Sequence, residues 1–314
     1  MSTVDLVLLV AAHNEEAALP AMHLRLLAVA EALGPGVRVL YVDDGSRDGT
    51  WALLSDFVAA CPERVGALRL SRNFGKELAL TAGLDHVPPG AAVVVLDADG
   101  QDPPELVPAM VARWRAGAEV VFGRRSERHG EPLLKRATAA AFYRVINALS
   151  DTPIPRDTGD FRLIGPRAVE ALRGLRERQR FMKGLFAWVG FRAEPFDYER
   201  APRVAGASKF NYWRLWNLAL EGITGFSTVP LRAATYIGLA SSLAAFAFGV
   251  WIVVRTLLWG DPVAGWPSLM VVIALLGGLQ LMALGIIGEY LGRLYLEAKQ
   301  RPLYIVDEAR LPGA

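Results

Sequence analysis

Two long runs without a charged residue, both near the C-terminus, constrain the fold of this chain most. They extend from Ala233 to Val254 and from Pro267 to Gly288, about 22 residues each. A helix of about 20 apolar residues is long enough to cross the ~30 Å hydrocarbon core of a bilayer. Two helices buried in a large soluble core are the alternative, but charged flanks and a short connection favour membrane spans. The runs therefore predict a two-helix transmembrane hairpin within residues 231–290.

Basic residues flank this hairpin on its outer sides and are scarce in its loop. Arg255 is the only one in the loop, whereas the flanks contain Arg200, Arg203, Lys209, Arg214 and Arg232 before the hairpin and Arg293, Lys299 and Arg301 after it. Since lysine and arginine are enriched in cytoplasmic flanks, both termini are expected in the cytoplasm, with 291–314 as a cytoplasmic tail. The basic, Trp-rich segment 209–230 has the composition of an amphipathic helix in the membrane interface. A helix packed on the preceding domain is its alternative.

The first 208 residues show the alternation of an α/β domain. No basic region precedes the first apolar run, which indicates a strand and not a signal peptide. Apolar strand candidates are Leu6–Ala12, Val37–Val42, Ala67–Leu70, Ala92–Leu96 and Ala118–Phe122, with helical stretches between them at 16–33, 50–60 and 75–86. This alternation predicts a doubly wound, mostly parallel sheet.

Polar side chains collect directly after four of these strand candidates. The clusters are "HNEE", "DDGSRDGT", "DADGQDPPE" and "GRRSER". Ligands of open α/β sheets bind outside the carboxyl ends of the strands. The four clusters therefore predict one shared site.

The segment "VVVLDADGQDPPE", 93–105, has the pattern of a metal site. Asp97 and Asp99 are two residues apart at the end of a strand, and Gln101 is a possible third oxygen ligand. Mg²⁺ typically takes one or two protein carboxylates together with substrate phosphates and water. The alternative is a solvated turn that caps a helix starting near Pro103.

Other strand-end residues are candidate ligands for a nucleotide. Asp43, Asp44 and Glu15 can accept hydrogen bonds from a ribose or a base, and Arg124 together with Lys135 or Arg136 can face phosphate oxygens. The alternative for each basic residue is ordinary surface charge.

Several other classes of site are excluded or unsupported. "NFGKE" lacks the Ser or Thr and the upstream glycine of a P-loop, and no GxGxxG follows the first strand. The formal net charge of +2 gives no support for a nucleic-acid partner. The single cysteine, Cys61, excludes an internal disulfide.

Taken as a set, the motifs resemble a known family. The segments that carry the resemblance are "AAHNEE", "YVDDGSRDGT", "LSRNFGKELAL", "LDADGQDPPE", "FGRR", "TGDFRLI", "RFMKGLFAWVGF", "GASKF" and "GEYLGRLYLEAKQRPLYIV". They are similar to the GT-A, family-two glycosyltransferases that use polyprenyl phosphate as acceptor. This group includes dolichyl-phosphate mannose synthases, bactoprenol glucosyltransferases and undecaprenyl-phosphate aminoarabinose transferases. The last motif, after two spans, resembles the bacterial bactoprenol branch.

The resemblance implies roles for individual residues. A nucleotide-sugar pocket would be lined by Ala11, His13, Glu15, Val42, Asp44, Lys76, Asp97, Ala98 and Arg124. Mg²⁺ or Mn²⁺ would be held by Asp97, Asp99 and Gln101, and the acceptor phosphate by Arg136, Arg203 and Lys209. Asp160 matches the family's proposed catalytic aspartate. Two positions depart from the family pattern, because His13 stands where Tyr is common and Gly100 where Leu is usual.

The implied activity is the inverting transfer of a sugar, with glucose as the first candidate, from a UDP-sugar to undecaprenyl or another polyprenyl phosphate for cell-envelope glycosylation. The resemblance places the catalytic domain, 1–208, on the cytoplasmic side of a bacterial inner membrane, in a multi-pass protein that forms a homo-oligomer, by resemblance a tetramer. Mannose from GDP-mannose or an aminoarabinose-type sugar are alternative donors. A catalytically silent membrane scaffold is a further alternative, against which the intact acidic residues argue.

Overall fold

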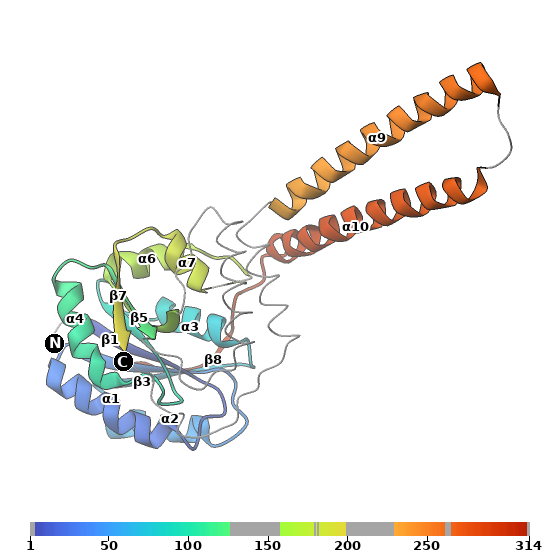
Figure 1. Cartoon of the computed structure of the whole chain (residues 1–314). Coiled ribbons are helices and arrows are strands. Elements are labelled where there is room, and N and C mark those ends of the chain that lie inside the picture. Colours follow the sequence, from blue (N-terminus) through green and yellow to red (C-terminus); the bar gives the residue numbers. More distant parts are fainter. Residues whose placement is uncertain are drawn as a thin grey trace.

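The computed structural model describes residues 4–125, 158–178, 180, 182–198, 229–260 and 265–312. Its strands are β1 (Leu6–Ala12), β2 (Val37–Asp43), β3 (Val65–Leu70), β4 (Ala92–Asp97), β5 (Val120–Arg125), β6 (Thr158–Ile164), β7 (Ala193–Tyr198) and β8 (Val306–Arg310). Its helices are α1 (Leu19–Leu33), α2 (Thr50–Ala60), α3 (Lys76–Asp85), the 3₁₀ turn η1 (Pro104–Leu106), α4 (Val107–Arg115), α6 (Pro166–Gly174), α7 (Met182–Trp188), α9 (Val229–Trp259) and α10 (Trp266–Ala298). Figure 1 shows a sheet domain from which α9 and α10 project.

The described strands form one sheet in the order β7-β5-β6-β4-β1-β2-β3-β8. The pairs β1–β2, β1–β4, β2–β3 and β5–β7 are parallel, whereas β6 and β8 are antiparallel to their neighbours. The predicted α/β class with a mostly parallel sheet is confirmed. The first predicted strand has the same bounds as β1, the other four correspond to β2–β5 with shifted ends, and β6, β7 and β8 are additional.

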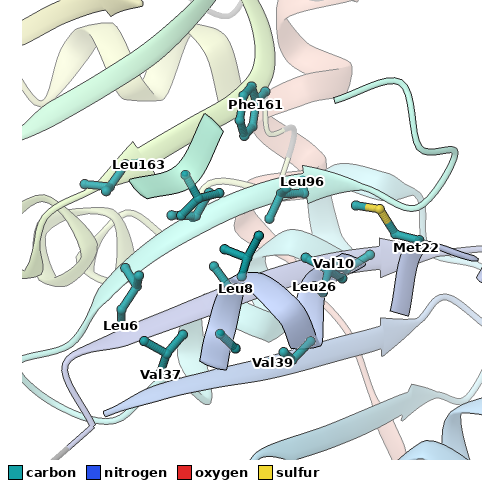
Figure 2. Close-up of a cluster of buried hydrophobic side chains, with 14 of the residues drawn as sticks. Leu6, Leu8, Val10, Met22, Leu26, Val37, Val39, Leu96, Phe161 and Leu163 are labelled. Atoms are coloured by element: carbon teal, nitrogen blue, oxygen red, sulfur yellow. The ribbon is translucent and has the colours of Figure 1, made fainter. Parts of the chain in front are cut away.

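Both faces of the sheet are covered by helices, which is the doubly wound arrangement. Along β1, Leu6, Leu8 and Val10 point to one face, where they pack with α1, α2 and α4. Val7 and Leu9 point to the other face and pack with α3, α6 and α7. This alternation follows from the period of two in a strand. Figure 2 shows the first cluster, in which Met22 and Leu26 of α1 lie over strand side chains.

The local sequence explains where α1 begins and ends. Apolar side chains recur at three- and four-residue spacing, at Leu19, Met22, Leu26 and Val29, and all are buried. Such spacing lines up one face of a helix. A proline lies in its first turn, and Gly34 follows its last residue with φ of +112°. Glycine adopts this conformation without the steric penalty of a side chain.

The helices α9 and α10 lie side by side and contact each other (Figure 1). Within them, Leu231–Trp251 and Leu275–Ala298 are long and apolar enough to cross a membrane, and neither window is buried inside the described structure. The first window starts two residues before the predicted run 233–254. The second starts eight residues after the start of the predicted run 267–288 and ends ten residues beyond it. Most of the predicted interfacial segment, 209–230, lies outside the described residues.

The segment after α10 returns to the sheet domain. Its strand β8 pairs antiparallel with β3 at the edge of the sheet. Tyr304 donates a hydrogen bond from its hydroxyl to Asp85 Oδ2 at 2.7 Å, and Glu297 Oε1 accepts one from the backbone N–H of Arg178 at 2.7 Å. The region expected as a tail, 291–314, therefore starts within α10 and continues into the sheet.

A buried histidine predicts how stability depends on pH. His23 is 6% exposed, its ring stacks on Phe57 at 3.8 Å, and its Nδ1 lies 2.9 Å from the Tyr41 hydroxyl. Burial lowers the pKa of His23 below its ordinary value of 6.5. The unfolded state therefore binds more protons below about pH 6.5, and the free energy of unfolding should fall there by at most about 1.4 kcal/mol per pH unit from this residue.

Thermal melting between pH 7.5 and 5 measures this effect. His23→Phe, which cannot bind a proton, should show a shallower loss of melting temperature on acidification than the wild type. If melting temperature fell equally steeply with pH in the two proteins, His23 would not be the source of the pH dependence.

Candidate functional site

A cleft of about 410 Å³ opens at the carboxyl ends of β1, β2 and β4. Its lining is Ala11, Ala12, His13, Glu15, Asp44, Asn73, Gly75, Lys76, Ala79, Asp97, Ala98 and Asp99. Three of the four polar clusters thus meet in one place, as expected for parallel strands whose carboxyl ends share one edge of a sheet.

Hydrogen bonds join the loop after β1 to the loop after β2. The backbone N–H of Asn14 donates to Ser46 Oγ at 2.9 Å, and the N–H of Arg47 donates to Asn14 Oδ1 at 2.9 Å. The N–H of Gly49 donates to Glu16 Oε2 at 2.9 Å. Asn14 has φ of +56°, a left-handed conformation that asparagine tolerates better than most residues. These bonds hold one wall of the cleft in a fixed shape.

His13 connects this wall to a third loop. Its Nδ1 lies 2.9 Å from the carbonyl oxygen of Asp44, and its Nε2 lies 2.9 Å from the Asn73 amide nitrogen. A carbonyl oxygen can only accept, so Nδ1 must carry the proton and Nε2 accepts from the amide. His13 therefore acts as a cross-link between strand-end loops and also lines the cleft.

Asp44 organises the loop that leads into α3. Its two carboxylate oxygens accept hydrogen bonds from the backbone N–H groups of Phe74 and Gly75, at 2.7 and 2.9 Å. Gly75 has φ of +100°, which glycine adopts readily and other residues do not. The next residue is Lys76, so the carboxylate of Asp44 determines where that lysine enters the cleft. Its neighbour Asp43 is fully buried and accepts from the N–H of Ser46.

Replacing Asp44 by Asn tests this role. Asparagine offers one acceptor oxygen in place of two, so one of the Phe74 and Gly75 N–H groups would face an NH₂ group. Loss of a buried, charge-assisted hydrogen bond costs about 1.5–3 kcal/mol. We expect a melting temperature for Asp44→Asn that is lower than that of the wild type, measured by differential scanning calorimetry. An unchanged melting temperature would contradict the role of Asp44 in holding this loop.

Two carboxylates from neighbouring strands enclose the ammonium of Lys76. Its Nζ contacts Asp97 Oδ1 at the end of β4 and lies 2.5 Å from Asp160 Oδ2 on β6. Burial disfavours the ammonium, but the negative charges of Asp160 and Asp97 outweigh it and raise the pKa of Lys76. The lysine is therefore charged throughout the physiological range. This arrangement places Asp160 beside the cleft.

The loop after β4 presents the candidate metal ligands. Asp97 and Asp99 line the cleft, whereas the side chain of Gln101 is not part of that lining. Asp99 Oδ1 accepts from the backbone N–H of Gln101 at 3.1 Å, and Gly100 has φ of +72°. The positive φ supplies a physical reason for glycine at this position, where a leucine side chain would be strained.

Contacts outside the cleft hold this loop in place. Arg25 of α1 forms an ion pair with Glu105 at 2.7 Å, and the Tyr198 hydroxyl donates to Asp102 Oδ1 at 2.8 Å. Within the described ranges, no three His, Cys, Asp or Glu side chains gather closely enough to hold a metal on their own. Two carboxylates beside an open cleft instead fit an ion that also takes substrate phosphate oxygens.

The remaining predicted site residues lie away from the cleft or outside the residues that the structure describes. Val42 is fully buried within the core between β2 and α3 and does not line the cleft. Arg124 is exposed and pairs with Asp197 of β7 at 2.6 Å. Arg136, Arg203 and Lys209 lie outside the described residues.

Sequence reasoning did not single out Ala12, Asn73, Gly75 and Ala79, all of which line the cleft. The first lies in the motif "AAHNEE" and the others in "LSRNFGKELAL", so position within these segments is the signal that could have identified them.

Comparison with known proteins gives consistent matches. The model of the family described as glycosyl transferase family 2 matches residues 7–173. The bactoprenol glucosyl transferase of Shigella phage SfV is 47% identical over 303 residues, which cover 96% of this chain and 98% of that protein. An uncharacterized glycosyltransferase of Synechocystis sp. is 46% identical, covering 98% of this chain and 96% of that protein. The prophage bactoprenol glucosyl transferase homolog of Escherichia coli K12 is 44% identical, covering 96% of this chain and 98% of that protein.

The matched segment extends from the second residue of β1 through β6 and contains every residue that lines the cleft. The resemblance stated from the motifs is therefore confirmed. The chain belongs to glycosyl transferase family 2.

Proposed function

We propose that the protein transfers glucose from UDP-glucose to a polyprenyl phosphate such as undecaprenyl phosphate, with inversion at the anomeric carbon. The observation that carries the proposal is a cleft lined by acidic side chains, Asp44, Asp97 and Asp99, in a chain that also has two helices of membrane-spanning length. Relatives named bactoprenol glucosyl transferase match it over both parts at 44–47% identity.

The donor is expected to bind in the cleft with its diphosphate toward Asp97 and Asp99. Lys76 stands at the same place and can donate to phosphate oxygens, while His13 and Glu15 line the wall that would face the nucleoside. Asp97 and Asp99 would hold Mg²⁺ or Mn²⁺, and Gln101, whose side chain does not line the cleft, is the proposed third ligand. The donor set fits such an ion, because hard divalent cations prefer oxygen ligands and share them with phosphates. A bound ion would offset the negative charge that develops on the departing diphosphate.

The chemical step is a single in-line displacement. An oxygen of the acceptor phosphate forms a bond to the anomeric carbon while the bond from that carbon to the UDP oxygen breaks, and the electron pair leaves with UDP. The second pKa of a phosphate monoester is about 6, so the nucleophile is mostly dianionic at pH 7. Asp160 is therefore assigned to positioning the sugar or the acceptor. Arg136, Arg203 and Lys209 are proposed to bind the acceptor phosphate.

The proposed place of action is the cytoplasmic face of a bacterial inner membrane. The hairpin of α9 and α10 would span the bilayer, with the sheet domain and both termini on the cytoplasmic side, because basic residues precede and follow the two spans. The polyprenyl chain of the acceptor would then lie in the bilayer beside the hairpin. A homo-oligomer, by family resemblance a tetramer, is part of this proposal.

A donor panel tests the proposed reaction. Purified protein in detergent is mixed with undecaprenyl phosphate, Mn²⁺ and each of UDP-glucose, UDP-aminoarabinose-type sugars and GDP-mannose, and both lipid-linked sugar and free nucleotide are measured. We expect product with UDP-glucose and equimolar UDP release. Product only with another donor would correct the sugar, and no product with any donor would refute the proposed class of reaction.

Chelation tests the metal separately. Excess EDTA should reduce UDP release to background, because the diphosphate would then leave without charge compensation, a loss of several kcal/mol of transition-state stabilisation. Addition of Mg²⁺ or Mn²⁺ should restore it. Full activity in EDTA would refute a metal-dependent mechanism while leaving the transfer reaction itself intact.

A further inference from the structure

The sheet brings two carboxylates face to face. In the antiparallel pair of β4 and β6, Val93 is opposite Ile164 and Val95 is opposite Arg162. Asp97 and Asp160 lie two residues further along these strands, and one carboxylate oxygen of each contacts the same Lys76 Nζ, so the two carboxylates lie close together. Two ionised carboxylates that share a site repel each other. A cation between these two side chains therefore stabilises the site when both are ionised.

Lys76 supplies this cation. Its Nζ contacts Asp97 Oδ1 and lies 2.5 Å from Asp160 Oδ2, and the three side chains are 38%, 22% and 18% exposed. Lys76 is the first residue of α3, where the helix dipole disfavours a positive charge. Helix electrostatics thus do not account for a lysine here, whereas the facing carboxylates do.

The position of this ammonium coincides with the proposed metal site. Asp97 is bound to Lys76 in the described structure and is also a ligand in the proposed metal site. The ammonium of a lysine is a compact point charge on a flexible four-carbon stem. Lys76 also lines the cleft, so its side chain has open space beside it. The ammonium can therefore leave the carboxylates by rotation of its own side chain without a change in the backbone.

We propose that Lys76 is an internal cation that competes with the divalent metal for Asp97, and that the donor diphosphate relieves this competition by giving the ammonium a new partner. This inference rests on the proposed function for the identity of the donor. It predicts that metal binds weakly to the protein alone and much more tightly together with UDP. Before the donor binds, the ammonium of Lys76 would balance the carboxylates. After it binds, the metal ion would balance the carboxylates and the ammonium would balance the diphosphate.

Direct measurement of Mn²⁺ binding, by electron paramagnetic resonance of the free ion, tests the proposal without any acceptor or turnover. Without nucleotide, Lys76→Met should bind Mn²⁺ at least about tenfold more tightly than the wild type, because the competing charge is gone. Lys76→Arg should bind it several-fold more weakly, since a guanidinium can pair with both carboxylates through its rigid fork. Added UDP should tighten Mn²⁺ binding by a larger factor in the wild type than in Lys76→Met.

A matched control removes a nearby charge that touches neither carboxylate. Arg72 lies four residues before Lys76, stacks over Phe74 at 4.0 Å and donates to the Asn73 carbonyl. Arg72→Met should leave Mn²⁺ affinity unchanged, which separates a specific competition from the general loss of a positive charge.

Two results would overturn the proposal. The first is Mn²⁺ affinity in folded Lys76→Met that is equal to or weaker than that of the wild type, which would mean that the lysine orients Asp97 for the metal. The second is a Mn²⁺ affinity of Lys76→Arg that equals that of the wild type. This result decides the question if Lys76→Met does not fold. Failure of sugar transfer to a polyprenyl phosphate would refute the proposed function and leave these binding results unaffected.

Discussion

Replacing Asp160 by Asn is expected to lower the rate of sugar transfer by about 10²–10³-fold, which is the usual cost of losing one preorganised charge at a reacting centre. Asparagine keeps the shape of the side chain but not its charge. Positive charge develops near the anomeric carbon in glycosyl transfer, and the carboxylate lies beside the cleft, 2.5 Å from Lys76 Nζ. The measurement is steady-state formation of lipid-linked glucose, with UDP affinity determined in parallel.

The pH dependence of this defect separates positioning from proton abstraction. At pH 8.5 the acceptor phosphate is dianionic and needs no base. A positioning role predicts that Asp160→Asn remains slow at this pH, whereas a base role predicts that the defect becomes small. Asp56→Asn, on the exposed side of α2, is the matched control and should retain wild-type turnover. Near-wild-type turnover of Asp160→Asn would refute a decisive role for this carboxylate.

Ending the chain after Gln300 should have the second large effect, this time on stability. The truncation removes β8, whose ladder with β3 extends from Ala67 to Leu70, and it removes the hydrogen bond from Tyr304 to Asp85. It also exposes the edge of β3, and an unprotected edge strand favours association between molecules. We expect a melting temperature lower by on the order of 10 °C and a larger aggregated fraction in size-exclusion chromatography.

Tyr304→Phe is the graded control for the truncation. It removes only the hydroxyl that bonds to Asp85, at a cost of about 1 kcal/mol, and leaves the strand in place. The expected order of melting temperatures is wild type, then Tyr304→Phe, then the truncated chain. If the truncated protein had the same melting temperature as the wild type, β8 would contribute nothing to the stability of the sheet.

The sequence predicted the parallel part of the sheet because those strands are buried on both faces. β1 and β4 are continuous apolar runs, and that signal needs no knowledge of the fold. β6 gave no such signal, since Asp160 is charged and pairs with Lys76, and Arg162 is buried with its guanidinium 3.8 Å from the Phe186 ring. β8 is an edge strand with mostly charged side chains, and its pairing depends on a chain that returns from α10.

The candidate site was also predictable only in part, namely for the residues that directly follow parallel strands. Carboxylates after parallel strands must meet at one edge, and Asp44, Asp97 and Asp99 do so. The contact of Lys76 with Asp160 joins residues 84 positions apart, and no local pattern encodes it. Nor does a local pattern show that Asp44 holds the loop at Gly75.

The return of the chain to β8 also limits how far the sheet domain can move. Residues 299–305 alone connect the end of α10 to β8, and seven residues span at most about 25 Å. With α10 embedded in the bilayer as proposed, this short tether limits how far the cleft can move away from the lipid surface. The acceptor phosphate would then be met by a reaction centre that stays within a short, bounded distance of the membrane.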